Sequence, residues 1–306
     1  MDVVAAVMRD LHLSAAGYRR LELAAPWAIS FSQAGLRGVH VVMKGRCEVV
    51  FDQGPVQHLD QGDLIIAPRA DAHVLRSPGA TRVPVTPAAA LAGQGAGGRI
   101  RMDGDGEKTL ILCGAFAFEE TAHPSLAGLP RIVHVQGSKG RPPHWLRGYI
   151  DALMAEAQDE GPGSDVVMAR LSAAIVTRAL RHDIRWASDP GWLRGLSDPF
   201  IAKALGIMHD ACAHPWTVEA LARNVGLSRA VFAARFSELV GEPPMRYLYL
   251  LRMQQAGRML REGRTGLGQI ADAVGYQSEA ALCAAFKRHA GVAPGQFRKN
   301  MLAPRH

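Results

Sequence analysis

Four side chains in the first half of the sequence are candidates for metal ligation or thiol redox chemistry because they fall in predicted strands: His40, Cys47, His73 and Cys113. Imidazole nitrogen and thiolate sulfur suit zinc, copper or iron, so a metal held by His40, His73 and Cys47 is one hypothesis. The spacing gives it little support, because no C-x-x-C pair occurs and a lone histidine in a strand is more often a hydrogen-bonded core residue. We therefore assign no metal site and no certain cofactor.

The same residues support two other hypotheses. Cys47 and Cys113 could sense oxidants or electrophiles, whereas a buried thiol in an apolar strand is usually inert. Alternatively, the N-terminal part binds a small organic effector, whose identity the sequence leaves open. His40 and His73 would then be polar points in an apolar pocket formed with Trp27, Val42 and Phe116.

The elements that must position these residues are short strands. A helix is predicted over residues 2–13, and strand signals extend from Tyr18 to about Val135. VHVVMKGRCEVV contains two β-branched runs that break at Gly45, and TLILCGAFAF is another apolar run. Residues 78–106 carry few such signals, so we expect a mobile or disordered loop there. An all-β domain, barrel-like or sandwich, is predicted.

Two helices should follow the strands. Residues 137–143 are rich in Gly and Pro and are predicted to be a hinge. Apolar stripes beginning at Leu146 and Val166, separated by Gly161-Pro162-Gly163, indicate an antiparallel helix pair. Such a pair could cover the β domain or join two chains into a dimer, and an apolar stripe alone does not decide between them.

The C-terminal part repeats one unit. LARNVGLSRAVFAARF is followed by IADAVGYQSEAALCAAF, with Gly226 recurring after 49 residues as Gly275 and Ser228 after 50 as Ser278. Each copy has a short helix, a glycine turn, a serine N-cap and a longer helix with apolar residues at i and i+4. This is the layout of a helix-turn-helix, whose second helix enters the DNA major groove. A single long helix from Pro244 to Arg261 should separate the two units and fix their spacing.

The charge distribution agrees with a DNA-binding C-terminal part. The net charge is +7, and residues 196–306 hold 14 Lys and Arg against 8 Asp and Glu. The rest of the chain is nearly neutral, so the excess lies where phosphate attraction requires it. The apolar fraction of 48% is that of a globular protein, and no apolar run is long enough to span a membrane. We expect no membrane partner and a cytoplasmic location.

The motifs resemble those of a known family. "PWTVEALARNVGLSRAVFAARFSELVGEPPMRYL" and "IADAVGYQSEAALCAAFKRHAGVAPGQFR" are similar to the paired helix-turn-helix units of AraC/XylS-type regulators, and "GDLIIAPRADAHVL" resembles a cupin motif of their sensor domains. The resemblance implies a cupin-like β-barrel at residues 1–138, a helical linker or dimerisation segment at 139–195, and an all-α double helix-turn-helix domain at 196–306. A histidine often found in that sensor branch is Arg69 here, which removes a possible metal ligand.

The resemblance also implies which residues contact DNA. Base-contacting positions fall at Arg229, Ala230, Ala233, Ala234, Gln277, Glu279, Ala280, Ala281 and Ala284. Independently of the resemblance, phosphate anchoring is expected from the helix N-termini at Ser228 and Ser278 and from the charges of Arg252, Lys287, Arg288, Arg298 and Lys299. The family often has Arg where this chain has Ala234 and Ala284, and a bidentate Arg–guanine contact contributes about 1–3 kcal/mol of discrimination. We pair Arg229 with Ser278 and Ala230 with Glu279, so the two halves should read different bases.

The predicted function is that of a sequence-specific transcription regulator and not of an enzyme. Its partners would be double-stranded promoter DNA, a second copy of the chain in a homodimer and RNA polymerase; activation and repression both remain open. The alternative is a cupin-type metal-dependent enzyme fused to a DNA-binding module. The first-motif H-x-H with an acidic residue, which cupin enzymes show, is reduced here to His40 alone.

Overall fold

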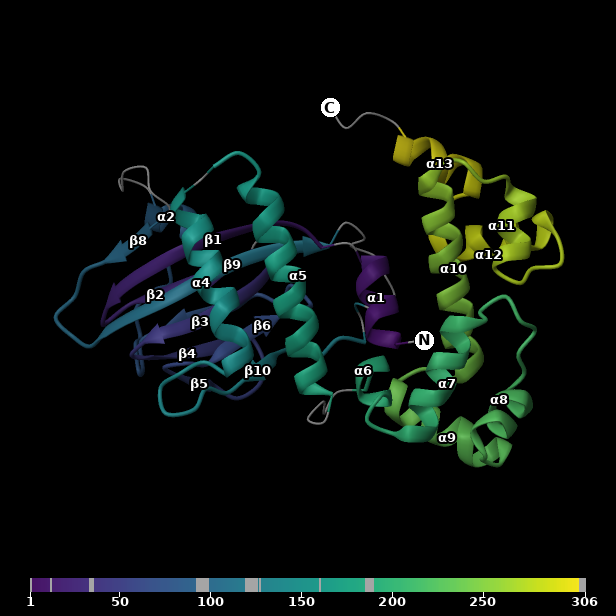
Figure 1. Cartoon of the computed structure of the whole chain (residues 1–306), viewed down its shortest axis with the longest axis horizontal. Coiled ribbons are helices and arrows are strands. Elements are labelled where there is room, and N and C mark those ends of the chain that lie inside the picture. Colours follow the sequence, from purple (N-terminus) through teal and green to yellow (C-terminus); the bar gives the residue numbers. More distant parts are fainter. Residues whose placement is uncertain are drawn as a thin grey trace. The chain divides into compact units, whose positions relative to one another are not determined.

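The chain folds into two compact units, one of β-sheets and one of helices (Figure 1). The computed structural model describes residues 2–11, 13–32, 36–91, 99–118, 126, 128–159, 161–184 and 190–302. The β unit comprises residues 11–121 and 129–185, so it includes the helix pair that follows the strands. The helical unit comprises the remaining residues, so nearly all of the N-terminal helix α1 (Val3–Leu11) belongs to it.

Two sheets form the β unit. One has six strands in the order β10-β6-β3-β9-β1-β8, and the other has four in the order β2-β7-β4-β5. The six-stranded sheet comprises β1 (Leu13–Ala24), β3 (Arg37–Lys44), β6 (Leu64–Ala67), β8 (Arg99–Met102), β9 (Lys108–Phe118) and β10 (Val133–Val135). The four-stranded sheet comprises β2 (Ala28–Phe31), β4 (Arg46–Phe51), β5 (Gln57–Asp60) and β7 (His73–Arg76). The predicted β domain is therefore confirmed, as two facing sheets.

Side chains from both sheets meet in one apolar core. Leu21, Val42 and Ile111 of the larger sheet pack in the same cluster as Ile29 and Leu75 of the smaller one. Because side chains alternate along a strand, the neighbouring residues face the other way. Phe116 lies on that outer face, opposite Arg37 in the ladder. Its predicted place in the inner pocket is therefore wrong, whereas Trp27 and Val42 do belong to the inner cluster.

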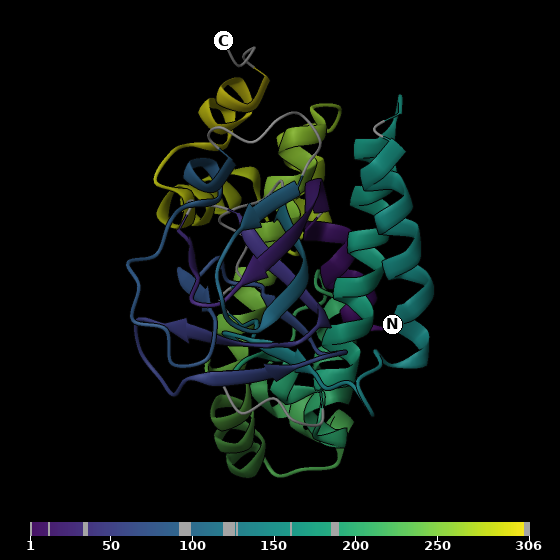
Figure 2. The same ribbon diagram turned by 90° about the vertical axis from the view of Figure 1, so that its left-hand side faces the viewer.

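The helix pair covers the outer face of the six-stranded sheet. Helices α4 (His144–Asp159) and α5 (Ser164–Asp183) lie side by side, and both pack on β1 (Figures 1 and 2). The buried hydroxyl of Tyr18 lies 2.9 Å from Ser172 Oγ. Since Ser172 donates its own proton to the carbonyl of Met168, Tyr18 must be the donor. Two roles were predicted for this pair, and the structure shows the first, which is to cover the sheet.

Two connecting segments differ from the sequence expectation. Within residues 78–106, helix α2 (Pro87–Leu91) forms and β8 pairs in parallel with β1, so this stretch is not simply a loop; residues 92–98 lie outside the described part. The start of the predicted hinge at 137–143 is hydrogen-bonded to the strand region. Asp63 accepts hydrogen bonds from the Gly137 amide (2.7 Å) and from His134 Nε2 (2.9 Å). Those hydrogen bonds hold the pKa of Asp63 below its ordinary value, although burial opposes them.

Among the described residues, eight further helices belong to the second unit, and their order matches the predicted repeat. They are α6 (Trp192–Gly195), α7 (Pro199–Asp210), α8 (Val218–Val225), α9 (Arg229–Val240), α10 (Pro244–Glu262), α11 (Leu267–Ala273), α12 (Glu279–Ala290) and α13 (Pro294–Leu302). The helix-turn-helix units are α8–α9 and α11–α12. Helix α10 has 19 residues and so spans about 28 Å at 1.5 Å per residue. The single connecting helix predicted from the sequence is confirmed.

The two repeats are also held together by the loop before α8. A Cβ atom added to Gly275, in the turn of the second repeat, would overlap the carbonyl oxygen of Ala213. On either side of Ala213, the carbonyls of Cys212 and His214 accept hydrogen bonds from Arg252 of α10, each 2.8 Å long. This loop therefore contacts both the connecting helix and the second turn.

None of the described helices is long and apolar enough to cross a membrane.

Candidate functional site

Serine side chains begin both recognition helices, α9 and α12. Ser228 Oγ accepts a hydrogen bond from the Val231 amide (3.4 Å), and Ser278 Oγ accepts one from the Ala281 amide (3.2 Å). The predicted N-caps are thus confirmed. Because both serines hold the same place, Arg229 corresponds to Glu279 and Ala230 to Ala280. The sequence-based pairing of Arg229 with Ser278 was wrong by one residue.

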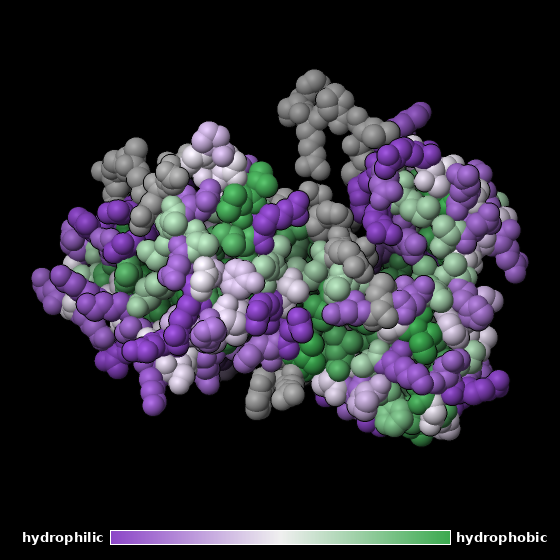
Figure 3. All heavy atoms as spheres, in the orientation of Figure 1, coloured by the Kyte–Doolittle hydropathy of each residue, from purple (hydrophilic) through white to green (hydrophobic). Residues whose placement is uncertain are grey.

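The apolar face of each recognition helix is buried. Phe232 and Phe236 of α9 and Leu282 and Phe286 of α12 are at most 2% exposed. The predicted base-contacting positions lie on the opposite, exposed faces, apart from Ala233, which is half-buried. Hydrophilic side chains follow the edge of the unit where α8 and α11 lie (Figure 3). The sequence reasoning missed Val231, which is 50% exposed on α9; its repeat counterpart Ala281 would have indicated it.

Arg229, at the first position of α9, is held by an acidic residue of the preceding helix. Its Nε lies 2.7 Å from Glu219 Oε1, and the two side chains are 69% and 50% exposed. Hydrogen bonding of Glu219 to its own backbone amide and the nearby Arg229 charge hold the pKa of Glu219 below its ordinary value. The ion pair engages Nε of Arg229, so a bidentate contact to a guanine would use the terminal Nη1 and Nη2 donors unless Glu219 is first released.

The predicted phosphate-binding side chains fall into two groups. Ser228, Ser278, Lys287, Arg288 and Lys299 are exposed. Arg252 and Arg298 instead donate to backbone carbonyls: Arg252 to the loop before α8, and Arg298 to Thr265 at 2.6 Å. These two guanidinium groups stabilise loops of the unit, which sequence patterns do not reveal because the acceptors are backbone atoms.

A further structural contact on α9 has no signal in the repeat. Arg235 Nε donates to Asp198 Oδ2 at 2.6 Å, and the same carboxylate accepts the Phe200 and Ile201 amides through Oδ1. Asp198 is therefore both the N-cap of α7 and the acceptor for Arg235. This pair fixes the first recognition helix against α7.

Inside the β unit, the two predicted histidines meet across the sheets. His40 of β3 and His73 of β7 approach to 2.8 Å between their Nε2 atoms, and Phe31 stacks on His73. His73 Nδ1 donates to the Asp71 carbonyl, so a neutral His73 accepts at Nε2 and His40 donates there. His40 Nδ1 is then an unprotonated nitrogen, buried with no hydrogen-bond partner among the described residues. Burial lowers the pKa of both rings, which favours these neutral forms.

The two predicted cysteines are buried thiols. Cys113 of β9 lies opposite His40 in the ladder, and Cys47 of β4 packs in the apolar cluster. Burial raises the pKa of each to about 12, so neither forms a thiolate near neutral pH. Across the described residues, no three His, Cys, Asp or Glu side chains gather closely enough to hold a metal ion. The histidine pair alone therefore does not form the ligand set of a cupin metal.

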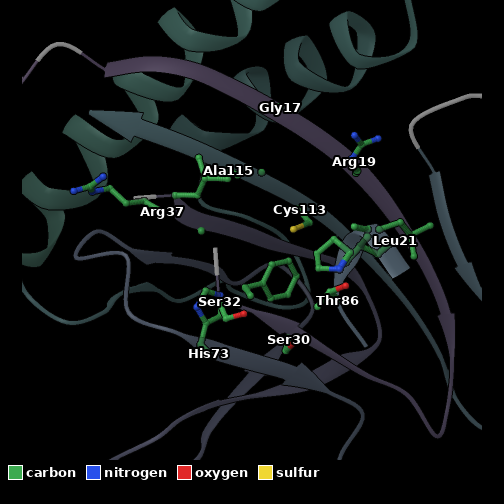
Figure 4. A pocket seen from close by; sticks show the side chains of 17 residues that line it. Gly17, Arg19, Leu21, Ser30, Ser32, Arg37, His73, Thr86, Cys113 and Ala115 are labelled. Carbon is green, nitrogen blue, oxygen red and sulfur yellow. The ribbon is translucent and has the colours of Figure 1, made fainter. Parts of the chain in front are cut away.

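A cavity of about 620 Å³ opens beside the histidine pair (Figure 4). The structure brings His73 and Cys113 to its wall, together with residues that the sequence reasoning did not select. These include, on β1, Gly17, Arg19 and Leu21; on and after β2, Ser30, Phe31 and Ser32; on β3, Arg37 and Gly38; and, elsewhere, Thr86, Pro87, Ile100 and Ala115. The alternation of β1 could have indicated Arg19, since Leu21 two residues later is apolar and buried.

Comparison with known proteins agrees with both units. The sequence profile of the cupin family matches residues 2–185, and that of a helix-turn-helix domain matches residues 221–300. A relative from Streptomyces lividans, provisionally named an AraC-like transcription regulator, is 34% identical over 99% of this chain and 98% of its own. The HTH-type transcriptional regulator AlkR of Acinetobacter baylyi is 27% identical over 98% of this chain and 99% of its own.

Among solved structures, the DNA-binding domain of AdpA in complex with a target DNA is 31% identical, with a TM-score of 0.32, over 34% of this chain and 93% of that one. The full-length relatives and the two matched profiles carry the assignment. The chain belongs to the AraC-like transcription regulators, with an N-terminal cupin domain and a C-terminal helix-turn-helix DNA-binding domain.

Proposed function

We propose that the helical unit inserts α9 and α12 into successive major grooves on one side of promoter DNA, and that the β unit senses a small organic effector. The observation that carries the first part is the exposure of the groove-facing positions at two capped helix N-termini joined by one 19-residue helix. Successive major-groove faces lie about 34 Å apart. The length of α10, about 28 Å, is compatible with that spacing once the recognition helices project from it.

The two recognition helices should read different sequences. At the equivalent first positions, α9 carries the cation Arg229 and α12 carries the anion Glu279. Arginine pairs with the acceptors of guanine, whereas glutamate accepts a hydrogen bond from the cytosine amino group. Ala234 and Ala284 add only methyl contacts. The proposed site is therefore asymmetric within the footprint of one chain.

Effector binding is favoured over thiol oxidation as the signal. The thiols of Cys47 and Cys113 are held in their unreactive neutral form by burial, whereas a cavity of drug-like volume lies beside them. The alternative function, a metal-dependent cupin enzyme, would need more ligands than His40 and His73. We therefore propose a regulator and not an enzyme.

The experiment that tests this function is footprinting of the full chain on DNA that flanks its own coding region. Protection of two adjacent major grooves is expected; no sequence-selective protection at any site would refute the proposal. Arg229→Ala should change which sequences bind. Lys287→Ala should weaken binding to all of them about equally and reduce the slope of affinity against salt by about 1.

We extend the proposal to a homodimer that contacts RNA polymerase at the promoter. Support for the dimer comes from α5, which leaves Val166 and Val167 exposed on the surface of the β unit. Sedimentation of the full chain should then give twice the monomer mass, and Val166→Lys should reduce it to the monomer. An unchanged mass in that variant would exclude this part of α5 as the interface.

A further inference from the structure

We propose that the inner cavity takes an apolar monocarboxylate, whose anionic head pairs with Arg19; this rests on the proposed effector-sensing function. Arg19 lies on the inner face of β1, directly opposite Cys113 of β9. Its charge also lowers the pKa of Cys113, against the larger effect of burial. Figure 4 shows Arg19 above the same pocket as Cys113 and His73.

The cavity exists because one cross-strand row has almost no side chains. Gly17 of β1, Ala115 of β9 and Gly38 of β3 are in register across the six-stranded sheet. The histidine pair fills the space over Gly38, where an added Cβ would lie 2.6 Å from His40 Nε2. Over Gly17, an added Cβ would meet nothing within 4 Å. The hollow therefore opens at the β1 end of the row, next to Arg19.

The polar groups of the wall select the charge of the ligand. No Asp or Glu lines the cavity in the described part of the chain. Its other arginine, Arg37, donates to the Pro68 carbonyl and lies over the Phe118 ring. His73 has both ring nitrogens engaged. Within the described residues Arg19 has neither a hydrogen bond nor an ion pair, so one positive charge is left uncompensated.

The rest of the wall selects an apolar body. Leu21, Phe31, Ile100 and Pro87 surround the hollow, and Phe31 stacks on His73. A single guanidinium balances a single negative charge and can bind a carboxylate through two parallel hydrogen bonds. A phosphate monoester would bring a second negative charge, while the cavity's other cation, Arg37, already donates to the Pro68 carbonyl. These features together favour a monocarboxylate with an alkyl or aryl body.

The test is calorimetric titration of the full chain with three probes of one shape and different charge: octanoate, 1-octanol and octylammonium. Octanoate should bind about two- to fivefold more tightly than 1-octanol, because Arg19 is exposed and an exposed ion pair contributes up to about 1 kcal/mol. Octylammonium should bind more weakly than either. Equal affinities for octanoate and 1-octanol would overturn the carboxylate assignment, and so would failure of every probe to bind.

Variants separate the charge from the cavity. Arg19→Met should abolish the preference for octanoate over 1-octanol. Arg20→Met is the matched control, because Arg20 is the next residue on the same strand and already pairs with Glu22 at 3.0 Å; the preference should persist in it. Gly17→Leu should fill the hollow and prevent binding of both probes. A preference that survives Arg19→Met refutes the proposal.

The DNA-reading function is tested separately. Footprinting without any probe depends on the helical unit, whereas calorimetry without DNA depends on the β unit. Selective footprints together with no octanoate preference would overturn only the ligand assignment. Octanoate preference without any selective footprint would overturn only the proposed DNA-reading function.

Discussion

Replacing Gly275 by alanine tests how the two repeats are held in one unit. Gly226 and Gly275 occupy the same place in the two turns, with φ of 84° and 75°. Their surroundings differ, because a Cβ at Gly226 would meet nothing within 4 Å whereas one at Gly275 would overlap the Ala213 carbonyl. The same substitution at the two glycines therefore separates the cost of the backbone conformation from the cost of the lost contact.

The expected magnitudes follow from these surroundings. Alanine in the left-handed region costs about 1–2 kcal/mol, which is the whole effect expected for Gly226→Ala. Gly275→Ala must also displace the loop whose carbonyls accept from Arg252, and a hydrogen bond to a charged group contributes about 1.5–3 kcal/mol. Loss of one such bond brings the total to about 2.5–5 kcal/mol.

Hydrogen exchange on the full chain measures both effects locally. In Gly275→Ala, the opening free energy of the α12 amides should fall by the larger amount; in Gly226→Ala, that of the α9 amides should fall by the smaller one. DNA protection over both grooves should shrink to one groove in Gly275→Ala. Equal losses in the two variants would refute the reasoning that the loop around Ala213 holds the second repeat.

Three other substitutions have defined outcomes. Glu219→Gln should release Arg229 and tighten binding to the preferred DNA by about two- to fivefold, measured by fluorescence anisotropy, since an exposed ion pair contributes up to about 1 kcal/mol; weaker binding would contradict this. Arg235→Ala should lower the free energy of unfolding by about 2 kcal/mol, since it leaves the buried carboxylate of Asp198 with only its backbone donors; urea titration followed by circular dichroism checks it, and an unchanged midpoint would exclude the role. Burial lowers the pKa of His209 to about 4, so the unfolded chain binds the proton first and stability should fall as pH drops from about 6.5 to 4, by up to about 3 kcal/mol. His209→Gln should flatten that part of the pH profile, and an equally steep profile in the variant would assign the effect to other groups.

The repeat was predictable because its determinants are local. A serine cap, a glycine with positive φ and apolar residues at i and i+4 act within a few residues of one another, so α8, α9, α11 and α12 could be placed from the sequence. The pairing of Arg229 with the wrong counterpart arose from the extra turn residue, Gln277. The two observed caps align Ser228 with Ser278, as the 50-residue offset does, and so correct the pairing.

The contacts that were missed join residues far apart in the chain. The parallel pairing of β8 with β1 brings together residues 79 positions apart, as in Arg20 with Arg99, and no periodicity in residues 78–106 indicates it. Likewise, His40 and His73 could be selected by type, but their contact depends on how two sheets face each other. Arg19 was missed because a charged residue in a strand is usually assigned to the outer face.

Consecutive residues of strand β1 touch opposite layers of the β unit. Arg19 borders the cavity, whereas Tyr18 donates a hydrogen bond from its hydroxyl to Ser172 on α5. Ladder hydrogen bonds to β8 and β9 on either side keep the strand stiff. Because the strand is stiff, a ligand that displaces Arg19 would also displace Tyr18, the adjacent residue, which contacts α5. The six-stranded sheet would then carry a structural change from the cavity on its inner face to the helix pair on its outer face, without a hinge between them.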